Sequence, residues 1–331
     1  MPEVVLDVRD LRTRFATRLG DVEAVSDVSF HIERGETVAL VGESGSGKSV
    51  TALSILGLLE STGRIAAGSI EFNGRQLVGL PERQLRAIRG REIAMIFQDP
   101  ATCLDPVYTV ENQLVEALSI HQRISGTAAR ARAVELLKLV RMPDPEARMK
   151  SYQHQLSGGQ RQRVMIAMAL AMDPELLIAD EPTTALDVTV QAQILDLLRG
   201  LQERTGTAIL FVTHDLGVVA QVADRVVVMY AGRVVEEGSV RAVLKDPRNP
   251  YTQALLESMP GRVAGTGERL TPIEGVVPNL FAMPAGCRYA PRCPHAFDRC
   301  REESPPLLPV SGSRSSRCWL HDSGQLAGAR S

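Results

Sequence analysis

Short runs of apolar residues recur along the chain and predict buried strands. These runs occupy 36–41, 92–97, 175–181 and 207–213. Their length and their content of Val, Ile and Leu favour strands over helices. The third run is followed by a stretch with apolar residues on one helical face, at Val190, Ile194, Leu197, Leu198 and Leu201. The pattern therefore predicts buried strands with helices between them.

The N-terminal region has a different pattern. Residues 4–11 and 22–32 are rich in β-branched side chains with partial alternation, which predicts antiparallel strands ahead of the first buried strand. The stretch 68–74 has glycine turn signals at both ends and predicts a hairpin-like strand. We expect these segments to form a small sheet.

The middle of the chain predicts helices. Apolar residues at helical spacing mark 110–120 and 127–140, with Val134, Leu137 and Val140 on one face of the second stretch. A further helix is predicted after residue 160, where the apolar positions at i, i+3, i+4 and i+7 are Val164, Ala167, Met168 and Ala171. Together these helices indicate a helical insert at about 100–165.

A glycine-rich loop lies between the strand at 36–41 and a helix predicted at 50–59. It fits the phosphate-binding pattern G-x-x-x-x-G-K-[ST] at every fixed position. Its residues are Gly42, Glu43, Ser44, Gly45, Ser46, Gly47, Lys48 and Ser49. Backbone N–H groups and the helix N-terminus favour a polyphosphate, while Lys48 would reach the β- and γ-phosphates and Ser49 would ligate Mg²⁺. A simple connecting turn would not require the Lys-Ser pair.

A second candidate anion site follows the helical insert, in Leu156-Ser157-Gly158-Gly159-Gln160. Ser157 followed three residues later by Gln160 is a capping box, which would have a purely structural role. A capping box needs no glycines, however. Gly158 and Gly159 beside the cap expose backbone donors at a helix N-terminus, and such donors bind anions.

Two adjacent carboxylates, Asp180 and Glu181, end the strand predicted at 175–181. The carboxyl ends of strands are where α/β sheets place their ligands. Asp180 would hold Mg²⁺ through water, and Glu181 would orient or deprotonate an attacking water. The alternative is a turn that begins at Pro182. His214 ends the strand at 207–213, where it would reach a γ-phosphate, although a single histidine at a strand end is more often structural.

An aromatic residue in the N-terminal strands, Phe15, is the candidate to stack on an adenine ring. Packing in the core of the small sheet is an equally good explanation for an aromatic side chain at this position.

These motifs occur together in the order, and at about the spacing, of one family. The chain resembles the ATPase subunit of ATP-binding-cassette (ABC) transporters over roughly its first three quarters. The matching residues are Gly42 to Ser49, Gln98, Leu156 to Gln160, Leu176 to Glu181, Ala185-Leu186-Asp187 and His214. The resemblance implies an α/β fold with a P-loop ATPase core, an antiparallel β subdomain and a helical subdomain.

The resemblance also implies roles for single residues. Gln98 is the Q-loop residue that senses Mg²⁺ and the membrane partner, and Glu181 is the catalytic base. Ser157 and Gly159 make the signature contact. Asp187 is the D-loop residue, and His214 is the γ-phosphate switch. ATP and Mg²⁺ are the implied ligands.

Partners follow from the same resemblance. In this family the signature of one subunit closes over the ATP held by the phosphate loop of another, so two nucleotides lie in a head-to-tail dimer. We expect a second ABC ATPase, identical or different, two transmembrane permeases and an extracytoplasmic binding protein. The chain would then be peripheral, at the cytoplasmic face of the cell membrane.

The C-terminal part narrows the family. Residues 249–256, Asn-Pro-Tyr-Thr-Gln-Ala-Leu-Leu, resemble a signature of oligopeptide, dipeptide and nickel importer ATPases. Peptide is the favoured cargo, with nickel or another small solute as the alternative. We expect a nucleotide-binding domain at 1–240 and an irregular extension at 241–331, in which the segment 265–284 is rich in Gly and Pro.

Four of the five cysteines lie in this extension, at Cys287, Cys293, Cys300 and Cys318. The gaps of five, six and seventeen residues lack the close pairs of zinc ribbons, and a Cys-Pro step suits an iron–sulfur cluster. The candidates are a [4Fe-4S] cluster, zinc and unligated thiols. A similar motif in peptide-importer ATPases, which holds a [4Fe-4S] cluster, favours the first. Cys103 lies apart, and we expect it to be a small buried residue.

Composition excludes several classes. The 331 residues are 44% hydrophobic and carry a net charge of -2, without the basic footprint expected of nucleic-acid binding. The chain lacks an apolar run long enough to span a bilayer and a secretory signal at its N-terminus. The motifs of this chain lie too close together for the long coiled-coil arms of a DNA-repair ATPase. They occur once, whereas a translation-factor ATPase would carry two cassettes. A redox sensor with an attached ATPase remains as an alternative.

Overall fold

The computed structural model describes residues 3–122, 124–184, 186–259 and 272–322. The chain forms two compact units that alternate along the sequence. The first unit holds the start of the chain, Ile32–Glu36 and Gly79–Val212. The second unit holds Asp7–His31, Thr37–Val78 and the described residues from Thr213 onward. This division differs from the sequential one expected at residue 240, because both units draw on the N-terminal half of the chain.

A parallel sheet forms the centre of the first unit. β7 (Leu176–Asp180) pairs in parallel with β6 (Ile93–Ile96) on one side and with β8 (Ala208–Thr213) on the other. Every residue of β7 and β8 is buried, which explains their continuous apolar runs. α8 (Val188–Thr205) buries Ile194, Leu195, Leu197, Leu198 and Leu201. The predicted strands at 92–97, 175–181 and 207–213 are therefore confirmed.

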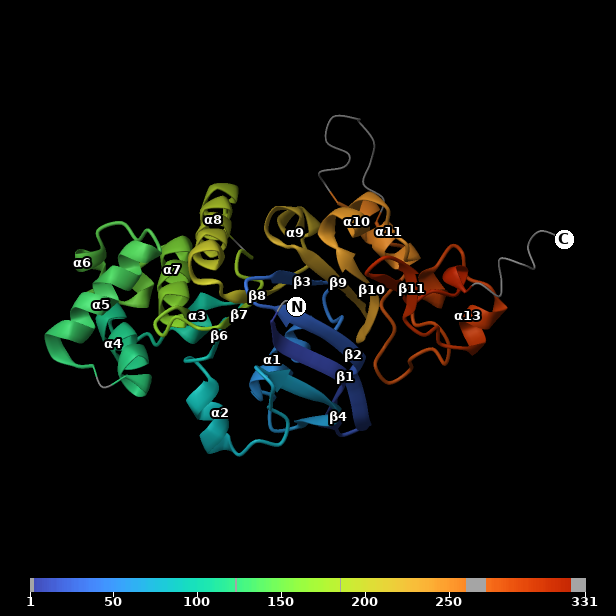
Figure 1. Cartoon of the computed structure of the whole chain (residues 1–331), viewed down its shortest axis with the longest axis horizontal. Coiled ribbons are helices and arrows are strands. Elements are labelled where there is room, and N and C mark those ends of the chain that lie inside the picture. The colour runs from blue at the N-terminus through green and yellow to red at the C-terminus, as the bar shows by residue number, and fades with distance from the viewer. Residues whose placement is uncertain (1–2, 123, 185, 260–271, 323–331) are drawn as a thin grey trace. The chain divides into compact units, whose positions relative to one another are not determined.

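Apart from α8, the helices of the first unit come from residues 82–169, and the green ribbons of Figure 1 show those of residues 110–169 lying together. They are α2 (Glu82–Ile88), α3 (Pro100–Cys103), α4 (Val110–His121), α5 (Gly126–Leu139), α6 (Pro145–Arg148), the 3-10 turn η1 (Gln153–Gln155) and α7 (Gly158–Ala169). The helices α4, α5 and α7 pack against one another. The helices predicted at 110–120 and 127–140 are confirmed, although the buried stripe of α5 runs through Ala133 and Leu136 while Val134 is only half-buried.

The second unit contains most of the two N-terminal strands. β1 (Val4–Thr17) and β2 (Gly20–Glu33) form a hairpin, and β4 (Gly63–Phe72) lies on the other side of β1. The short strand β5 (Arg75–Gln76) pairs antiparallel with β4 across an Asn73-Gly74 turn. The predicted small sheet is confirmed, and its first two strands are longer than expected.

A larger set of strands in the second unit carries the phosphate loop. β3 (Thr37–Val41) pairs in parallel with β9 (Arg225–Tyr230), and β10 (Arg233–Ser239) pairs antiparallel with β9. The helices are α1 (Lys48–Leu56), α9 (Leu216–Val222), α10 (Val240–Lys245) and α11 (Pro250–Glu257). β3 is wholly buried, so the loop that follows it begins on a fixed support.

The C-terminal extension is not irregular throughout, which corrects the prediction from sequence. β12 (Arg314–Ser316) pairs antiparallel with β10, and β11 (Leu308–Ser311) pairs with β12. The extension also contains the 3-10 turns η2 (Ala290–Arg292) and η3 (Trp319–His321) and the helix α13 (Asp298–Glu302). The strands form because backbone hydrogen bonds to an existing edge need few apolar side chains. The Gly- and Pro-rich stretch expected to be irregular lies partly outside the described residues, at 265–271.

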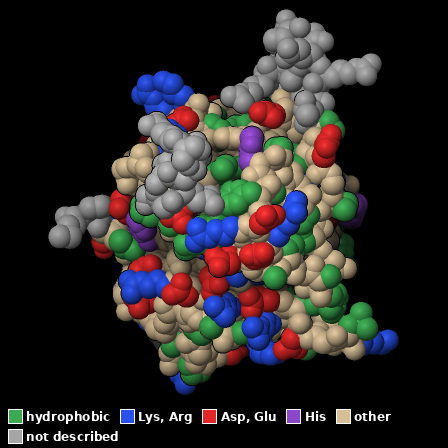
Figure 2. All heavy atoms as spheres, turned by 90° about the vertical axis from the view of Figure 1, so that its right-hand side faces the viewer, with side chains coloured by type: hydrophobic (Ala, Val, Ile, Leu, Met, Phe, Trp, Pro, Cys, Tyr) green, Lys and Arg blue, Asp and Glu red, His purple; other side chains and the backbone are tan. Residues whose placement is uncertain are grey.

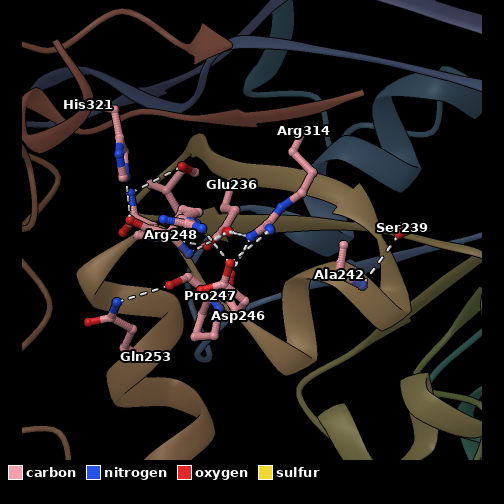
Figure 3. A network of polar contacts seen from close by, with 11 residues as sticks. Glu236, Ser239, Ala242, Asp246, Pro247, Arg248, Gln253, Arg314 and His321 are labelled. Atoms are coloured by element: carbon pink, nitrogen blue, oxygen red, sulfur yellow. Dashed lines mark hydrogen bonds and ion pairs between the residues drawn. The ribbon is translucent and has the colours of Figure 1, made fainter. Parts of the chain in front are cut away.

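A buried ion pair fastens this extension to the sheet (Figure 3). Arg314 Nη2 on β12 donates to Glu236 Oε1 on β10 at 3.1 Å, and both side chains are almost wholly buried. The same carboxylate accepts the backbone N–H groups of Arg248 and Asn249 at 2.8 and 2.9 Å. Glu236 therefore joins a strand of the sheet, the start of α11 and the C-terminal strand at one point.

Charges of both signs are mixed on the face of the molecule that Figure 2 shows. Figure 2, which looks at the right-hand side of Figure 1, shows Lys and Arg side chains next to Asp and Glu side chains. The extension contributes ion pairs such as Arg299 with Asp322, whose Nη1 and Oδ2 atoms are 2.7 Å apart. Within the described ranges, we find no helix with the length and hydropathy that crossing a membrane requires.

Candidate functional site

The phosphate loop connects β3 to α1 in the second unit, as the sequence predicts. The helix begins at Lys48, two residues before the expected start, and it ends at Leu56 because Gly57 adopts a left-handed conformation with φ of 61°. A side chain at Gly42 would place its Cβ 2.1 Å from the carbonyl oxygen of Met229. Only glycine allows the loop to pass this close to β9.

Lys48 points into the curve of the loop. Its side chain is buried, and Nζ donates to the carbonyl oxygens of Gly42 at 2.8 Å and Glu43 at 3.0 Å. Ser46 and Gly47 are also buried, whereas Ser44 and Gly45 are exposed and Ser49 is half-buried. An ammonium group inside a loop of glycines at a helix N-terminus is suited to binding an anion.

Two other predicted site residues belong to the same unit. His214 directly follows β8 and is exposed, while its neighbour Asp215 caps α9 by accepting the Gly217 N–H at 2.7 Å. Phe15 on β1 is half-buried, and its ring lies against Gly63, where an added Cβ would be 2.8 Å from Cε1 of the ring. Packing therefore accounts for part of the Phe15 ring, and its stacking on adenine stays a prediction.

In the first unit, the structure brings Gln98 and Glu181 together. The Gln98 side-chain amide donates to Oε2 of Glu181 at 2.9 Å, and the Thr184 hydroxyl donates to the same oxygen at 2.9 Å. Glu181 follows β7 directly and has a φ of 46°, a left-handed conformation that is uncommon for glutamate. Its N–H donates to Val212 on β8 at 2.8 Å. Asp180, the last residue of β7, is buried.

Backbone strain of this kind is concentrated at functional sites. A turn that begins at Pro182, the structural alternative, does not require a left-handed Glu181 held by two side-chain donors. The geometry thus favours the interpretation of Glu181 as a positioned carboxylate.

The second predicted anion site lies at the start of α7. Ser157 caps this helix, accepting the Gln160 N–H at 3.3 Å, while the Gln160 side chain accepts the Ser157 N–H at 3.1 Å. The predicted capping box is therefore confirmed. Ser157 and Gly158 are exposed, so the N-terminus of α7 is accessible to another molecule.

Gly159 has a packing role that the sequence did not indicate. A Cβ on Gly159 would lie 2.9 Å from Cγ1 of Val190, in the first turn of α8. Asp187 caps this helix by accepting the Val190 N–H at 2.9 Å, and it is exposed. The predicted signature and D-loop residues, Gly159 and Asp187, therefore both lie against Val190. Ala185, another residue of that motif, lies outside the described residues.

The predicted nucleotide residues thus fall into two sets. The second unit holds the phosphate loop, Phe15 and His214, and the first unit holds the rest. In the second unit, Lys48 lies inside the phosphate loop and bonds its carbonyl oxygens. In the first unit, Gln98 contacts Glu181, and Gly159 packs against the helix that Asp187 caps.

The four cysteines of the extension converge on one cavity of the second unit, the cysteine cavity. Cys287, Cys293, Cys300 and Cys318 all line it, together with Arg233, Arg288, Arg317, Tyr289 and Trp319. Cys300 and Cys318 are buried, and the other two thiols are half-buried. Burial raises the pKa of the Cys287 and Cys293 thiols, and it raises the pKa of Cys318 to about 12.

Three arginines that line this cavity, Arg233, Arg288 and Arg317, are half-buried. Arg317 donates to the carbonyl oxygens of Val234 at 2.8 Å and Pro305 at 3.2 Å, and Arg288 donates to that of Ala231. Burial lowers the pKa of Arg288 to about 10, with repulsion from Arg233 adding to the effect. Burial and Arg233 lower the pKa of Arg317 in the same way. Cationic side chains therefore line the cavity beside the four thiols.

The thiols do not form a ligand set as they stand. Across the described residues, no group of three or more His, Cys, Asp or Glu side chains is arranged so that it could hold a metal ion. The chemistry of the donors fits a thiolate-bound centre, because four sulfur atoms and nearby cations surround one space. Because the thiols of the described residues are not arranged as a ligand set, the geometry does not confirm the predicted [4Fe-4S] cluster.

The expectation that Cys103 is buried is wrong. Cys103 is the last residue of α3 and is exposed. Asp99 caps this short helix, accepting the Ala101 N–H at 2.8 Å, and the turn directs the residues after Gln98 to the surface.

Two residues that contact the phosphate loop were not predicted as site residues. Asn249 caps α11, Pro250 occupies its first turn, and the hydroxyl of Tyr251 accepts the N–H of Glu43 at 2.9 Å. Arg292, next to Cys293, forms an ion pair with the Glu43 carboxylate. The Asn-Pro-Tyr motif could have indicated Tyr251 as a functional residue, whereas nothing in the sequence indicated Arg292.

Known proteins resemble this chain in sequence and in fold. Residues 25–184 match the family model described as ABC transporter, and residues 235–300 match that described as oligopeptide/dipeptide transporter, C-terminal region. The chain is 54% identical over 318 residues to the probable peptide ABC transporter ATP-binding protein y4tR of Sinorhizobium fredii, covering 96% of this chain and 95% of that protein. It is 50% identical over 323 residues to the dipeptide transport ATP-binding protein DppD of Escherichia coli, covering 97% and 98%.

A solved structure gives the same result. The ATP-binding cassette MJ0796, in a dimeric post-hydrolysis state bound to ADP and Pi, superposes with a TM-score of 0.65 and 31% identity. The match covers 71% of this chain and 99% of that one. The chain therefore belongs to the ATP-hydrolysing subunits of ABC transporters, within the family that carries the oligopeptide/dipeptide transporter C-terminal region.

Proposed function

We propose that this ATPase powers the import of di- or oligopeptides, through ATP-driven closure of a head-to-tail dimer with a second ABC ATPase. The observation that carries the proposal is the positioned Glu181, which follows a buried strand and is held by Gln98 and Thr184 at 2.9 Å each. The names of the relatives from S. fredii and E. coli support peptide as the cargo. Reconstitution with the permeases in vesicles, followed by measurement of ATP-dependent peptide uptake, tests it.

In the proposed hydrolysis, each chemical task is assigned to a residue of this chain. Lys48 exchanges its bonds to the Gly42 and Glu43 carbonyls for bonds to the β- and γ-phosphates. Ser49, Gln98 and Asp180 are the residues that would hold Mg²⁺, which neutralises phosphate charge when it is bound. His214 contacts the γ-phosphate.

Glu181 is the proposed catalytic base. Its carboxylate orients the attacking water and takes its proton, and the bonds from Gln98 and Thr184 hold it in place before ATP arrives. This positioning lowers the reorganisation that the reaction requires.

The exposed signature supports the dimer. Ser157 and Gly158 present the N-terminus of α7 to the surface, where its backbone donors are able to bind a phosphate group held by another subunit. The structure of MJ0796 bound to ADP and Pi is dimeric, which also supports this part of the proposal. The second ATPase is either a copy of this chain or a different one.

The segment after Gln98 is the proposed contact with the permeases. Val107 and Tyr108, between α3 and α4, leave 71% and 53% of their surface exposed. Adjacent exposed apolar side chains often mark an interaction surface. We place the protein at the cytoplasmic face of the membrane, bound to two permeases that receive cargo from an extracytoplasmic binding protein.

We further propose that Cys287, Cys293, Cys300 and Cys318 ligate a [4Fe-4S] cluster that orders the extension. The support is their convergence on one cavity that Arg288 and Arg317 also line, since the positive charge of these arginines would offset the charge of a thiolate-bound cluster. The thiols would move together on binding. We retain residues 1–240 as the nucleotide-binding domain and 241–331 as the extension, a division that the separate family matches at 25–184 and 235–300 support.

A further inference from the structure

The second residue of the phosphate loop, Glu43, is held by the C-terminal part of the chain. Arg292 binds both carboxylate oxygens, with Nη1 donating to Oε2 at 2.8 Å and Nη2 donating to Oε1 at 3.1 Å. The Tyr251 hydroxyl accepts the backbone N–H of Glu43 at 2.9 Å. Both the side chain and the backbone of Glu43 are thus fixed by residues more than 200 positions later in the chain.

Arg292 is itself rigidly placed. Its side chain is 3% exposed, and its Nε donates to the Glu274 carbonyl at 2.8 Å. Its two Nη groups also donate to the Ile273 carbonyl at 3.2 Å and the Tyr230 hydroxyl at 3.3 Å. With the two bonds to Glu43, every N–H group of the guanidinium has a partner. A planar fork with all donors used fits in one orientation, which lysine would not reproduce.

The turn that carries Arg292 also carries two of the four cysteines. The carbonyl of Cys287 accepts the Ala290 N–H at 3.0 Å, and the Cys293 N–H donates to the Ala290 carbonyl at 3.3 Å. Cys287 and Cys293 line the cysteine cavity, while Arg292 between them reaches the phosphate loop. The placement of this turn therefore fixes the position of Glu43.

The contacts matter most when nucleotide binds. Lys48 now bonds the Glu43 carbonyl at 3.0 Å, and it gives up this bond when it reaches a phosphate. The contacts from Tyr251 and Arg292 remain, because they approach Glu43 at its N–H and its carboxylate. A loop that stays in place loses less conformational freedom on binding, which raises affinity.

We propose that Arg292 and Tyr251 are positioning residues of the phosphate loop, through which the C-terminal extension sets the affinity for nucleotide. The inference rests on the proposed binding of ATP at this loop. It assigns to the extension a part in nucleotide binding that acts through Glu43 of the phosphate loop.

A double-mutant cycle on the full-length protein tests the inference. The variants are Arg292→Gln, Glu43→Gln and their combination, and the measurements are the Kd of a fluorescent ATP analogue with Mg²⁺ and the KM and kcat for ATP. Each single change should weaken binding by roughly 5- to 150-fold, the usual range of coupling between sites. The Kd of the double variant should be no higher than that of the single variant with the higher Kd, since both changes remove the same contact. Tyr251→Phe, which removes only the hydroxyl, should weaken binding in the same direction.

The matched control is Arg314→Gln, which removes the other buried arginine–glutamate pair of the extension (Figure 3). Arg314 contacts Glu236 and Asp246, and neither residue belongs to the phosphate loop. This variant should lower the Tm while leaving the Kd for nucleotide unchanged.

Three results separate the explanations. An unchanged Kd in Glu43→Gln and Tyr251→Phe would overturn the inference, even if Arg292→Gln fails to fold. Equal weakening by Arg292→Gln and Arg314→Gln would also overturn it, because the effect would then be one of general stability. If the unmodified protein binds no nucleotide, the proposed function fails instead.

Discussion

The side-chain amide of Gln98 donates to Oε2 of Glu181 at 2.9 Å, although the two residues are 83 positions apart in the chain. β6 and β7 are parallel neighbours, so the residues that follow them meet at the same edge of the sheet. Glu181 additionally adopts a left-handed backbone with φ of 46°. The carboxylate proposed as the base is therefore held by a residue that follows the neighbouring strand.

Lys48→Ala should abolish nucleotide binding while leaving the fold intact. The buried ammonium is the positive group inside the loop, where its Nζ lies 2.8 Å from the Gly42 carbonyl oxygen. A ligand at 100 times its Kd stabilises a protein by about 2.7 kcal/mol. ATP with Mg²⁺ should therefore raise the Tm of the unmodified protein but not that of the variant. Equal shifts in both proteins would place the nucleotide elsewhere.

The two signature glycines should respond differently to alanine. Gly159→Ala forces a Cβ to within 2.9 Å of Val190, so it should destabilise the first unit by about 1–3 kcal/mol in urea unfolding. Gly158→Ala meets open space at the start of α7 and should not lower that free energy, because alanine is favoured over glycine in a helix by up to about 1 kcal/mol.

The same pair tests the proposed dimer. If Gly158 faces a nucleotide held by a second subunit, Gly158→Ala should lower ATP hydrolysis without loss of stability. Full activity in a stable Gly158→Ala variant would argue against a signature contact at this glycine.

Cys103 offers a natural probe for the permease contact. It is exposed at the end of α3, five residues after Gln98 in the printed sequence. A thiol-directed crosslinker should join it to a permease in the assembled complex, detected by mass spectrometry. Cys103→Ser is the control for crosslinks from the other cysteines. Crosslinks from Cys103 that reach only soluble proteins would count against this contact.

Protein purified without oxygen should contain about four irons per chain and absorb broadly in the visible range. Cys300→Ser should remove both signals, because Cys300 is buried at the cysteine cavity. Cys103→Ser should change neither. One zinc per chain in colourless protein would replace the cluster with a Cys₄ zinc site, and metal-free protein with four reactive thiols would exclude both.

Local motifs accounted for much of what could be predicted. The loop from Gly42 to Ser49 and the strand before it were predictable because the pattern fixes a residue type at each key position over a short distance. The capping box of Ser157 and Gln160 was predictable for the same reason. Apolar runs located the buried strands, since a strand covered on both faces has few polar residues.

Contacts between distant segments were not predictable. Nothing near Gly159 in the sequence indicates Val190, and nothing near Arg292 indicates Glu43, because the fold alone brings these residues together. The extension was predicted as irregular because it is rich in Gly and Pro, yet β12 pairs with β10 through its backbone. Cys103 was expected to be buried because cysteine usually is, but the α3 turn exposes it.

Glu181→Gln provides the most direct test of the central claim that this chain hydrolyses ATP with Glu181 as the base. The amide keeps the size of the side chain and the acceptor oxygen that Gln98 and Thr184 contact, but it takes up no proton at neutral pH. The variant should bind ATP as tightly as the unmodified protein and hydrolyse it about 10²–10⁴ times more slowly. Size-exclusion chromatography with ATP and Mg²⁺ should show it as a trapped dimer. Hydrolysis at the unmodified rate would contradict the account.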